Sequence, residues 1–156
     1  MSIFHSMNTT GSALTAQRLR MDVISSNIAN VDTTRAKQVN GEWEPYRKKS
    51  VEFTEDSGQF STFLNKAMGK TEKGEVGNGV RVTSIKEDKE TDFKLVYDPT
   101  HIDADENGYV KYSNVDLLKE MVDLVSATRS YEANVTVFNA NKSMLTKAQE
   151  IGRAHV

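Results

Sequence analysis

Residues 114–151 read NVDLLKEMVDLVSATRSYEANVTVFNANKSMLTKAQEI and contain neither glycine nor proline. From Leu117 onward, mostly apolar side chains recur at alternating spacings of four and three residues, the a/d pattern of a coiled-coil-like helix. The positions of this first stripe are Leu117, Met121, Leu124, Thr128, Tyr131, Val135, Phe138, Lys142 and Leu145. We expect one long helix, with Ser113 and Asp116 as a capping box at its start and Gly152 as its stop.

The N-terminal segment repeats this rhythm. Its first stripe consists of Ile3, Met7, Thr10, Leu14, Gln17, Met21, Ile24, Ile28 and Val31. The pattern predicts a second helix of about 28 residues, roughly 42 Å long. The simplest interpretation is that the two helices pair with each other, either antiparallel or parallel, and thereby bury one stripe on each.

Each segment also carries a second apolar line that such pairing does not explain. These positions are Ala16, Leu19 and Val23 in the first segment, and Leu118, Val122, Val125, Val137, Met144, Ala148 and Ile151 in the second. Burying six large apolar side chains contributes on the order of 10 kcal/mol, against an association cost of about 4–15 kcal/mol. One extra contact would be marginal, whereas several neighbours in a lattice would suffice, so we expect a self-associating or co-assembling protein.

We expect the assembly interface to include twelve of the apolar residues of the two first stripes. These residues are Met7, Leu14, Met21, Ile24, Ile28, Leu117, Met121, Leu124, Tyr131, Val135, Phe138 and Leu145.

The middle of the chain has a different composition. Seven of the nine glycines and both prolines lie between residues 41 and 108. Alternating apolar residues predict strands in four places, and the spacing of apolar residues over 60–68 predicts a short helix followed by a flexible loop at 69–79. The predicted strands are Tyr46–Phe53, Val80–Thr83, Phe93–Tyr97 and Tyr109–Tyr112, the last after an Asn107-Gly108 turn.

The predicted fold is therefore α+β, with long N- and C-terminal coiled-coil-like helices flanking a small inserted β domain. We expect three parts: an N-terminal helix at 1–34, a small β-rich domain at 35–113 and a C-terminal helix at 114–156.

Composition excludes several functional classes. The chain of 156 residues has no cysteine, which excludes disulfides, thiol catalysis and cysteine-based zinc sites. A net charge of −2 gives no general attraction to nucleic acid or anionic membranes. The mean hydropathy of −0.56 predicts no transmembrane span, and the first six residues lack the basic and apolar regions of a cleavable signal peptide.

One motif resembles a metal site. Asp103, Asp105, Asn107 and Gly108 match the first half of an EF-hand calcium loop, but the twelfth position is Asn114 rather than a bidentate glutamate. An Asp-rich hairpin turn is the favoured interpretation. The three histidines are far apart, Gly74, Gly77 and Gly79 lack the ending of a phosphate loop, and acidic residues surround Arg47-Lys48-Lys49. We therefore expect no catalytic site, no cofactor, no metal and no nucleic-acid partner.

Two boxes at the ends of the chain resemble a known family. Residues 26–34, SNIANVDTT, and residues 127–134, ATRSYEAN, are similar to the terminal signatures of bacterial flagellar rod and hook proteins. Residues 95–99, LVYDP, and 108–116, GYVKYSNVD, resemble the proximal rod proteins of the FlgC type. Distal rod and hook proteins tend to continue with a Thr-Pro-Gly-Tyr-like turn, whereas Thr33-Thr34-Arg35-Ala36 follows here, which favours the proximal type.

The resemblance implies a non-enzymatic structural subunit of the basal-body rod, located where the flagellum crosses the cell envelope. It implies export by the flagellar export apparatus without a cleaved signal peptide, and polymerisation with itself and other rod proteins through the terminal helices, without membrane insertion. An alternative from the residues alone is a non-catalytic coiled-coil adaptor or calcium-binding module.

Overall fold

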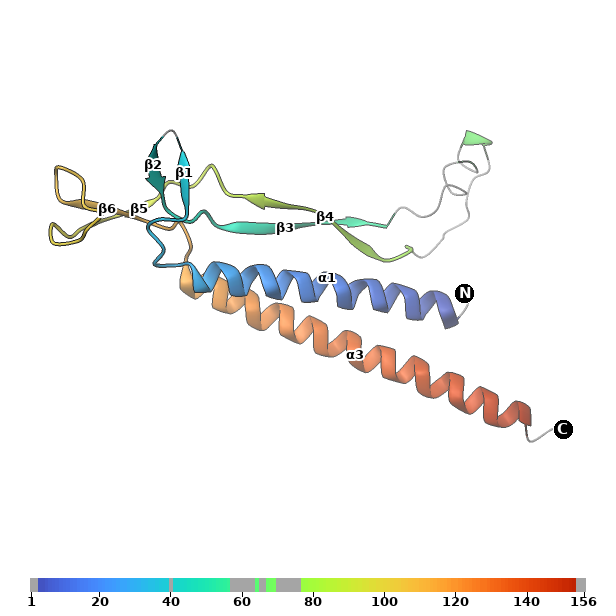
Figure 1. Cartoon of the computed structure of the whole chain (residues 1–156). Coiled ribbons are helices and arrows are strands. Elements are labelled where there is room, and N and C mark those ends of the chain that lie inside the picture. The colour runs from blue at the N-terminus through green and yellow to red at the C-terminus, as the bar shows by residue number, and fades with distance from the viewer. Residues whose placement is uncertain (1–2, 40, 57–63, 65–66, 70–76, 154–156) are drawn as a thin grey trace. The chain divides into compact units, whose positions relative to one another are not determined.

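Along the chain, a long helix comes first, a set of short strands follows, and a second long helix comes last. The computed structural model describes residues 3–39, 41–56, 64, 67–69 and 77–153 (Figure 1). The elements are α1 (Ile3–Ala29), β1 (Lys37–Val39), β2 (Glu42–Glu44), β3 (Lys49–Glu55), β4 (Val80–Glu87), β5 (Lys94–Tyr97), β6 (Tyr109–Tyr112) and α3 (Leu117–Arg153). This arrangement confirms the predicted α+β class.

The described strands form three two-stranded sheets, β1–β2, β3–β4 and β5–β6. All four strands predicted from alternation are present, as β3, β4, β5 and β6. The pair β1–β2 was not predicted; it is antiparallel, with Gln38 opposite Trp43. The predicted short helix at 60–68 and the loop at 69–79 fall largely outside the described residues.

Both expected ends of the C-terminal helix are wrong. The helix begins at Leu117, and Asp116 is its N-cap, since its Oδ1 accepts hydrogen bonds from the backbone N–H of Leu118 at 3.0 Å and of Lys119 at 3.3 Å. The Ser113 hydroxyl instead accepts a hydrogen bond from the N–H of Val115. Gly152 does not stop the helix, because α3 continues through it to Arg153.

The chain separates into two compact units. Unit 1 comprises residues 1–18, 53–83 and 128–156, and unit 2 comprises residues 19–52 and 84–127. These two units do not coincide with the three parts expected from the sequence. That the three parts are independent domains stays a prediction. Each unit is described by itself below.

In unit 1, side-chain hydroxyls of α1 connect the helix to its neighbours. Asn141 of α3 donates a hydrogen bond to Ser6 Oγ at 2.9 Å, and the N–H of Val80 at the start of β4 donates one to Ser12 Oγ at 3.1 Å. Thr10, a polar member of the first stripe, is buried, and its hydroxyl donates to the backbone carbonyl of Ser6. A polar residue is tolerated at this position because its hydrogen bond is made within the helix.

In unit 2, the C-terminal half of α1 packs antiparallel to the start of α3. Asn27 contacts Glu120, and Arg20 contacts Asp123 at 3.3 Å, so rising residue numbers in α1 meet falling numbers in α3. Helix pairing was therefore correctly expected, and its direction is antiparallel. The buried apolar side chains of this unit are Val23, Ile24, Tyr46, Val110, Val115 and Ala127.

The approach of β4 to α1 depends on the absence of a side chain at Gly79. This residue has a φ of +117°, and a Cβ there would collide with the Ser12 hydroxyl.

We expect Gly79→Ala to destabilise the protein by about 2 kcal/mol or more, because it combines backbone strain with loss of the Ser12 hydrogen bond. Gly41, with a φ of +91° and open space around its Cβ position, is the matched control. Gly41→Ala should cost only about 1 kcal/mol; equal losses of unfolding free energy in urea would contradict the role of the Ser12 contact.

Candidate assembly surface

The second apolar stripe of α3 is exposed along the helix. In unit 2, the exposed fractions are 76% for Leu118, 69% for Val122 and 60% for Val125. In unit 1, Val137, Met144 and Ile151 of the same helix are also exposed, with fractions between 49% and 64%. Exposed apolar patches larger than those of ordinary monomers mark interaction sites, so this face of α3 is a candidate assembly surface.

Most of the interface residues expected from the sequence are less accessible. Ile24 is buried, whereas Leu117 and Met121 are exposed. The other nine are half-buried, namely Met7, Leu14, Met21, Ile28, Leu124, Tyr131, Val135, Phe138 and Leu145. The first stripes thus serve largely within the subunit, and contact of these twelve residues with another subunit stays a prediction.

The second apolar line on α1 is less exposed than the one on α3. Ala16 and Val23 are both buried, and Val23 lines one pocket with Val51 of β3 and another with Ile85 of β4. The chain's own strands therefore cover Val23. The expectation that both helices leave a second stripe uncovered is therefore wrong for Ala16 and Val23 of α1, where Leu19 is half-buried, and it holds for α3.

A buried polar cluster fixes the position of α3 in unit 2. Asn27 is 1% exposed and Glu120 is 1% exposed. The Asn27 amide donates to Glu120 Oε2 at 2.9 Å and to the Lys49 carbonyl at 2.8 Å. Its Oδ1 accepts from the Tyr46 hydroxyl and from the Lys49 N–H, both at 3.0 Å. Every hydrogen-bonding position of this amide is thereby used.

The charge of Glu120 is balanced by Lys48. The Lys48 ammonium nitrogen lies 2.5 Å from Glu120 Oε1. A buried carboxylate is tolerated only when it is paired and hydrogen-bonded, and this one has both a cation and an amide. Glu120 was not predicted from the sequence. It lies four residues before Leu124 and seven before Ala127, which places it on the buried side of the helix. A charged residue at such a position is a usable signal of a buried ion pair.

The segment after α1 is held by the residues that carry the family resemblance. The Asn30 amide donates to the Ser26 carbonyl at 2.8 Å, and Thr33 donates to Asn30 Oδ1 at 3.2 Å. The Thr33 carbonyl accepts a hydrogen bond from the N–H of Tyr46. These polar residues of the SNIANVDTT box therefore stabilise the turn between α1 and the strands.

The Asp-rich segment lies in the connection between β5 and β6. Asp103 accepts hydrogen bonds from the Thr34 hydroxyl at 2.8 Å and from Arg35 Nε at 2.5 Å, and the Arg35 guanidinium is the main cause of the lowered pKa of this carboxyl. Asp103 thus anchors the connection to the segment after α1. Within the part of the chain that the structure describes, no three histidine or acidic residues are grouped closely enough to hold a metal ion.

Comparison with known proteins gives this arrangement a family. Residues 7–37 match the family described as flagella basal body rod protein, and residues 106–151 match the one described as flagellar basal body rod FlgEFG protein C-terminal. The chain is 63% identical to the flagellar basal-body rod protein FlgC of Bacillus subtilis over 153 residues, covering 98% of this chain and 100% of the relative. The chain belongs to the FlgC family of flagellar basal-body rod proteins.

Two other FlgC proteins show how widely the similarity extends. The one from Borreliella burgdorferi is 44% identical, with 97% of this chain and 98% of the relative covered. The one from Salmonella typhimurium is 39% identical, with 98% and 100% covered. As a FlgC family member, the chain is a structural, non-enzymatic subunit of the basal-body rod that assembles with other rod components in the flagellar basal body. None of the described helices has the length and apolarity to cross a membrane.

Removal of the Glu120 carboxylate tests the buried cluster. We expect Glu120→Ala to lower the unfolding free energy by about 3–5 kcal/mol, because it leaves the Lys48 charge and the Asn27 amide without their partner. Glu132, whose exposed carboxylate pairs with Arg129 at 3.1 Å, is the matched control on the same helix. Glu132→Ala should change the unfolding free energy by about 0.5 kcal/mol or less. Similar losses for the two variants in urea denaturation would contradict the structural role of Glu120.

The Asp103 anchor can be tested by titration. Because its pKa is lowered from 3.8, this group adds stability above that pH and loses it as the pH falls through the folded-state pKa. We expect Arg35→Gln to raise the Asp103 pKa toward its ordinary value, measured by NMR of the carboxyl carbon. The pKa of Asp98 is lowered mainly by the Thr100 hydroxyl, so it should not change. A shift of Asp98 together with Asp103, or of neither, would contradict the assignment.

Proposed function

We propose that the chain joins the rod through the exposed apolar stripe of α3, supported by the first-stripe residues that line the helix pair. The observation that carries the proposal is the exposure of Leu118, Val122 and Val125 on a helix whose opposite side is held inside the subunit by Glu120. A helix that served only intramolecular packing would carry polar residues on its outer face.

The energetics favour several neighbours over a single partner. Burying six of the exposed large apolar residues of α3, Leu118, Val122, Val125, Val137, Met144 and Ile151, would contribute on the order of 10 kcal/mol. Association costs about 4–15 kcal/mol, so one copy bound to one other copy would be marginal. A subunit packed among several neighbours shares this surface among many contacts, as required in a tubular polymer that transmits torque.

The finer features of the function follow from this assembly mode. In the proposed tube the terminal helices, 1–34 and 114–156, line the inside, and the region 35–113 faces outward. The proposal also includes delivery by the flagellar export apparatus, which membership of the FlgC rod family supports.

Aspartate substitutions in the stripe test the proposal. We expect Leu118→Asp with Val122→Asp to lower incorporation into purified basal bodies by about 100-fold or more, since two apolar contacts of roughly 1.5–3 kcal/mol each are lost. The melting temperature of the isolated chain should change little, because both side chains are exposed.

Leu95 on β5 provides the matched control. It is also an aliphatic side chain, with 61% exposure, but it lies outside the terminal helices. Leu95→Asp should retain incorporation and motility in soft agar. Normal incorporation of the double α3 variant, or equal loss with Leu95→Asp, would contradict assembly through the α3 stripe.

A further inference from the structure

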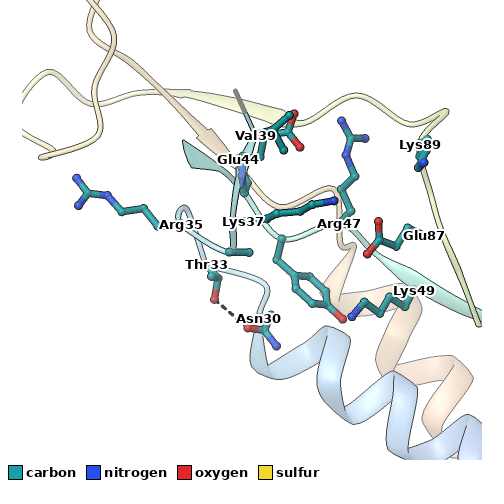
Figure 2. Close-up of a pocket in the computed structure, with 13 residues that line it drawn as sticks. Asn30, Thr33, Arg35, Lys37, Val39, Glu44, Arg47, Lys49, Glu87 and Lys89 are labelled. Atoms are coloured by element: carbon teal, nitrogen blue, oxygen red, sulfur yellow. Dashed lines mark hydrogen bonds between the residues drawn. The ribbon is translucent and has the colours of Figure 1, made fainter. Parts of the chain in front are cut away.

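A basic groove lies in unit 2 beside the β1–β2 pair (Figure 2). It encloses about 780 Å³ and is lined by five cationic side chains, those of Arg35, Lys37, Arg47, Lys49 and Lys89. The cations come from β1, β3 and the segments after α1, β2 and β4. Two carboxylates, of Glu44 and Glu87, also line the groove, and Figure 2 shows Glu87 beside Lys49.

Four of these cations have no carboxylate partner among the described residues. Arg35 is paired with Asp103, whereas no ion pair within 4.0 Å involves the other four or the two lining carboxylates. Arg47 instead lies over the Phe93 ring at 4.2 Å, and Lys49 lies 5.5 Å from the Tyr46 ring. The groove therefore carries a net positive charge that attracts an acidic partner.

The same chain presents an acidic loop of matching character. In the connection between β5 and β6, Asp105 and Glu106 are exposed and form no ion pair within the described part of the chain. Ile102 in this loop is 84% exposed. The loop is already shaped by its own backbone, since the N–H of Asp105 donates to the Tyr109 carbonyl and that of Gly108 donates to the Asp105 carbonyl. Binding would cost little ordering.

We propose that the acidic β5–β6 loop of one subunit docks into the basic groove of a second copy of this chain. The loop supplies the carboxylates of Asp105 and Glu106, and the groove supplies Lys37 and Lys89. The apolar side chain of Ile102 meets apolar groove residues, of which Val39 and Pro45 are two. This inference rests on the proposed assembly function and adds a second contact outside the terminal helices.

The geometry of such a contact suits a helical polymer. The loop and the groove are different surfaces, so each subunit uses its loop on one neighbour and offers its groove to another. A contact of this heterologous kind continues from subunit to subunit and closes only if the rotation allows it. Charge pairing at the rim also fixes which copy is accepted and in which orientation.

Cysteine cross-linking tests the contact in assembled basal bodies, because the native chain has no cysteine. Two chains are co-expressed, one carrying Lys89→Cys and the other Glu106→Cys, and the purified basal bodies are treated with a mild oxidant. We expect a reducible dimer of twice the 17.4 kDa chain mass. The control pairs Glu106→Cys with Lys86→Cys, an exposed β4 position outside the groove lining, and should give no dimer.

Several results would overturn the inference. Absence of the dimer when both chains are present in the basal bodies would do so, as would equal dimer formation with Lys86→Cys. Cross-linking of Glu106→Cys to a different rod protein would assign the loop to another partner. If the unmodified chain itself were missing from basal bodies, the proposed function would fail, which is a separate result.

A charge exchange provides an independent measurement. We expect Lys89→Glu or Glu106→Lys alone to lower incorporation by about tenfold, and both changes on one chain to restore it to within about twofold. Restoration requires that the two positions meet between subunits, which a general effect on folding would not produce. Additive losses in the double variant would contradict the docking contact.

Discussion

The buried contact between Asn27 and Glu120 is the interaction on which the arrangement of unit 2 depends. Apolar packing is not directional, so two striped helices could slide along each other at modest cost. The Asn27 amide has four hydrogen-bonding positions filled by Glu120, Tyr46 and the Lys49 backbone. Any shift of α1, β3 or α3 would leave a buried polar group or a charge without its partner. One register therefore satisfies the cluster, and it sets the places of three elements together.

This constraint also determines which side of α3 faces outward. With Glu120 and Ala127 buried against the rest of unit 2, the opposite side of the helix presents Leu118, Val122 and Val125. The polar cluster thus acts on assembly without touching a neighbour, because it orients the apolar stripe. On α1, Ala16 and Val23 of the corresponding second line are buried, so the two helices contribute unequally to the outer surface.

The sequence predicted the features that arise from local periodicity. Both helices and the strands β3 to β6 were found because their apolar spacing is regular over several residues. The strands β1 and β2 were missed because KQV and EWE are three-residue segments, too short to show alternation. Ser113 was expected to be part of the cap because the sequence pattern does not reveal which polar side chain, that of Ser113 or that of Asp116, accepts hydrogen bonds from the first N–H groups of the helix. Glu120 was missed because its amide partner lies 93 residues away in the chain.

The pairing of the strands has a consequence for a protein that must gather at high local density. Within the described residues each strand has a single neighbour, so each ribbon keeps two open edges of backbone N–H and C=O groups. Open edges can recruit foreign strands and seed amyloid-like fusion. Here the two shortest strands carry Lys37, Glu42 and Glu44, and β4 carries Arg81, Lys86 and Glu87. Charges of this kind discourage edge-to-edge fusion, which leaves orderly polymer growth to the specific surfaces of the subunit.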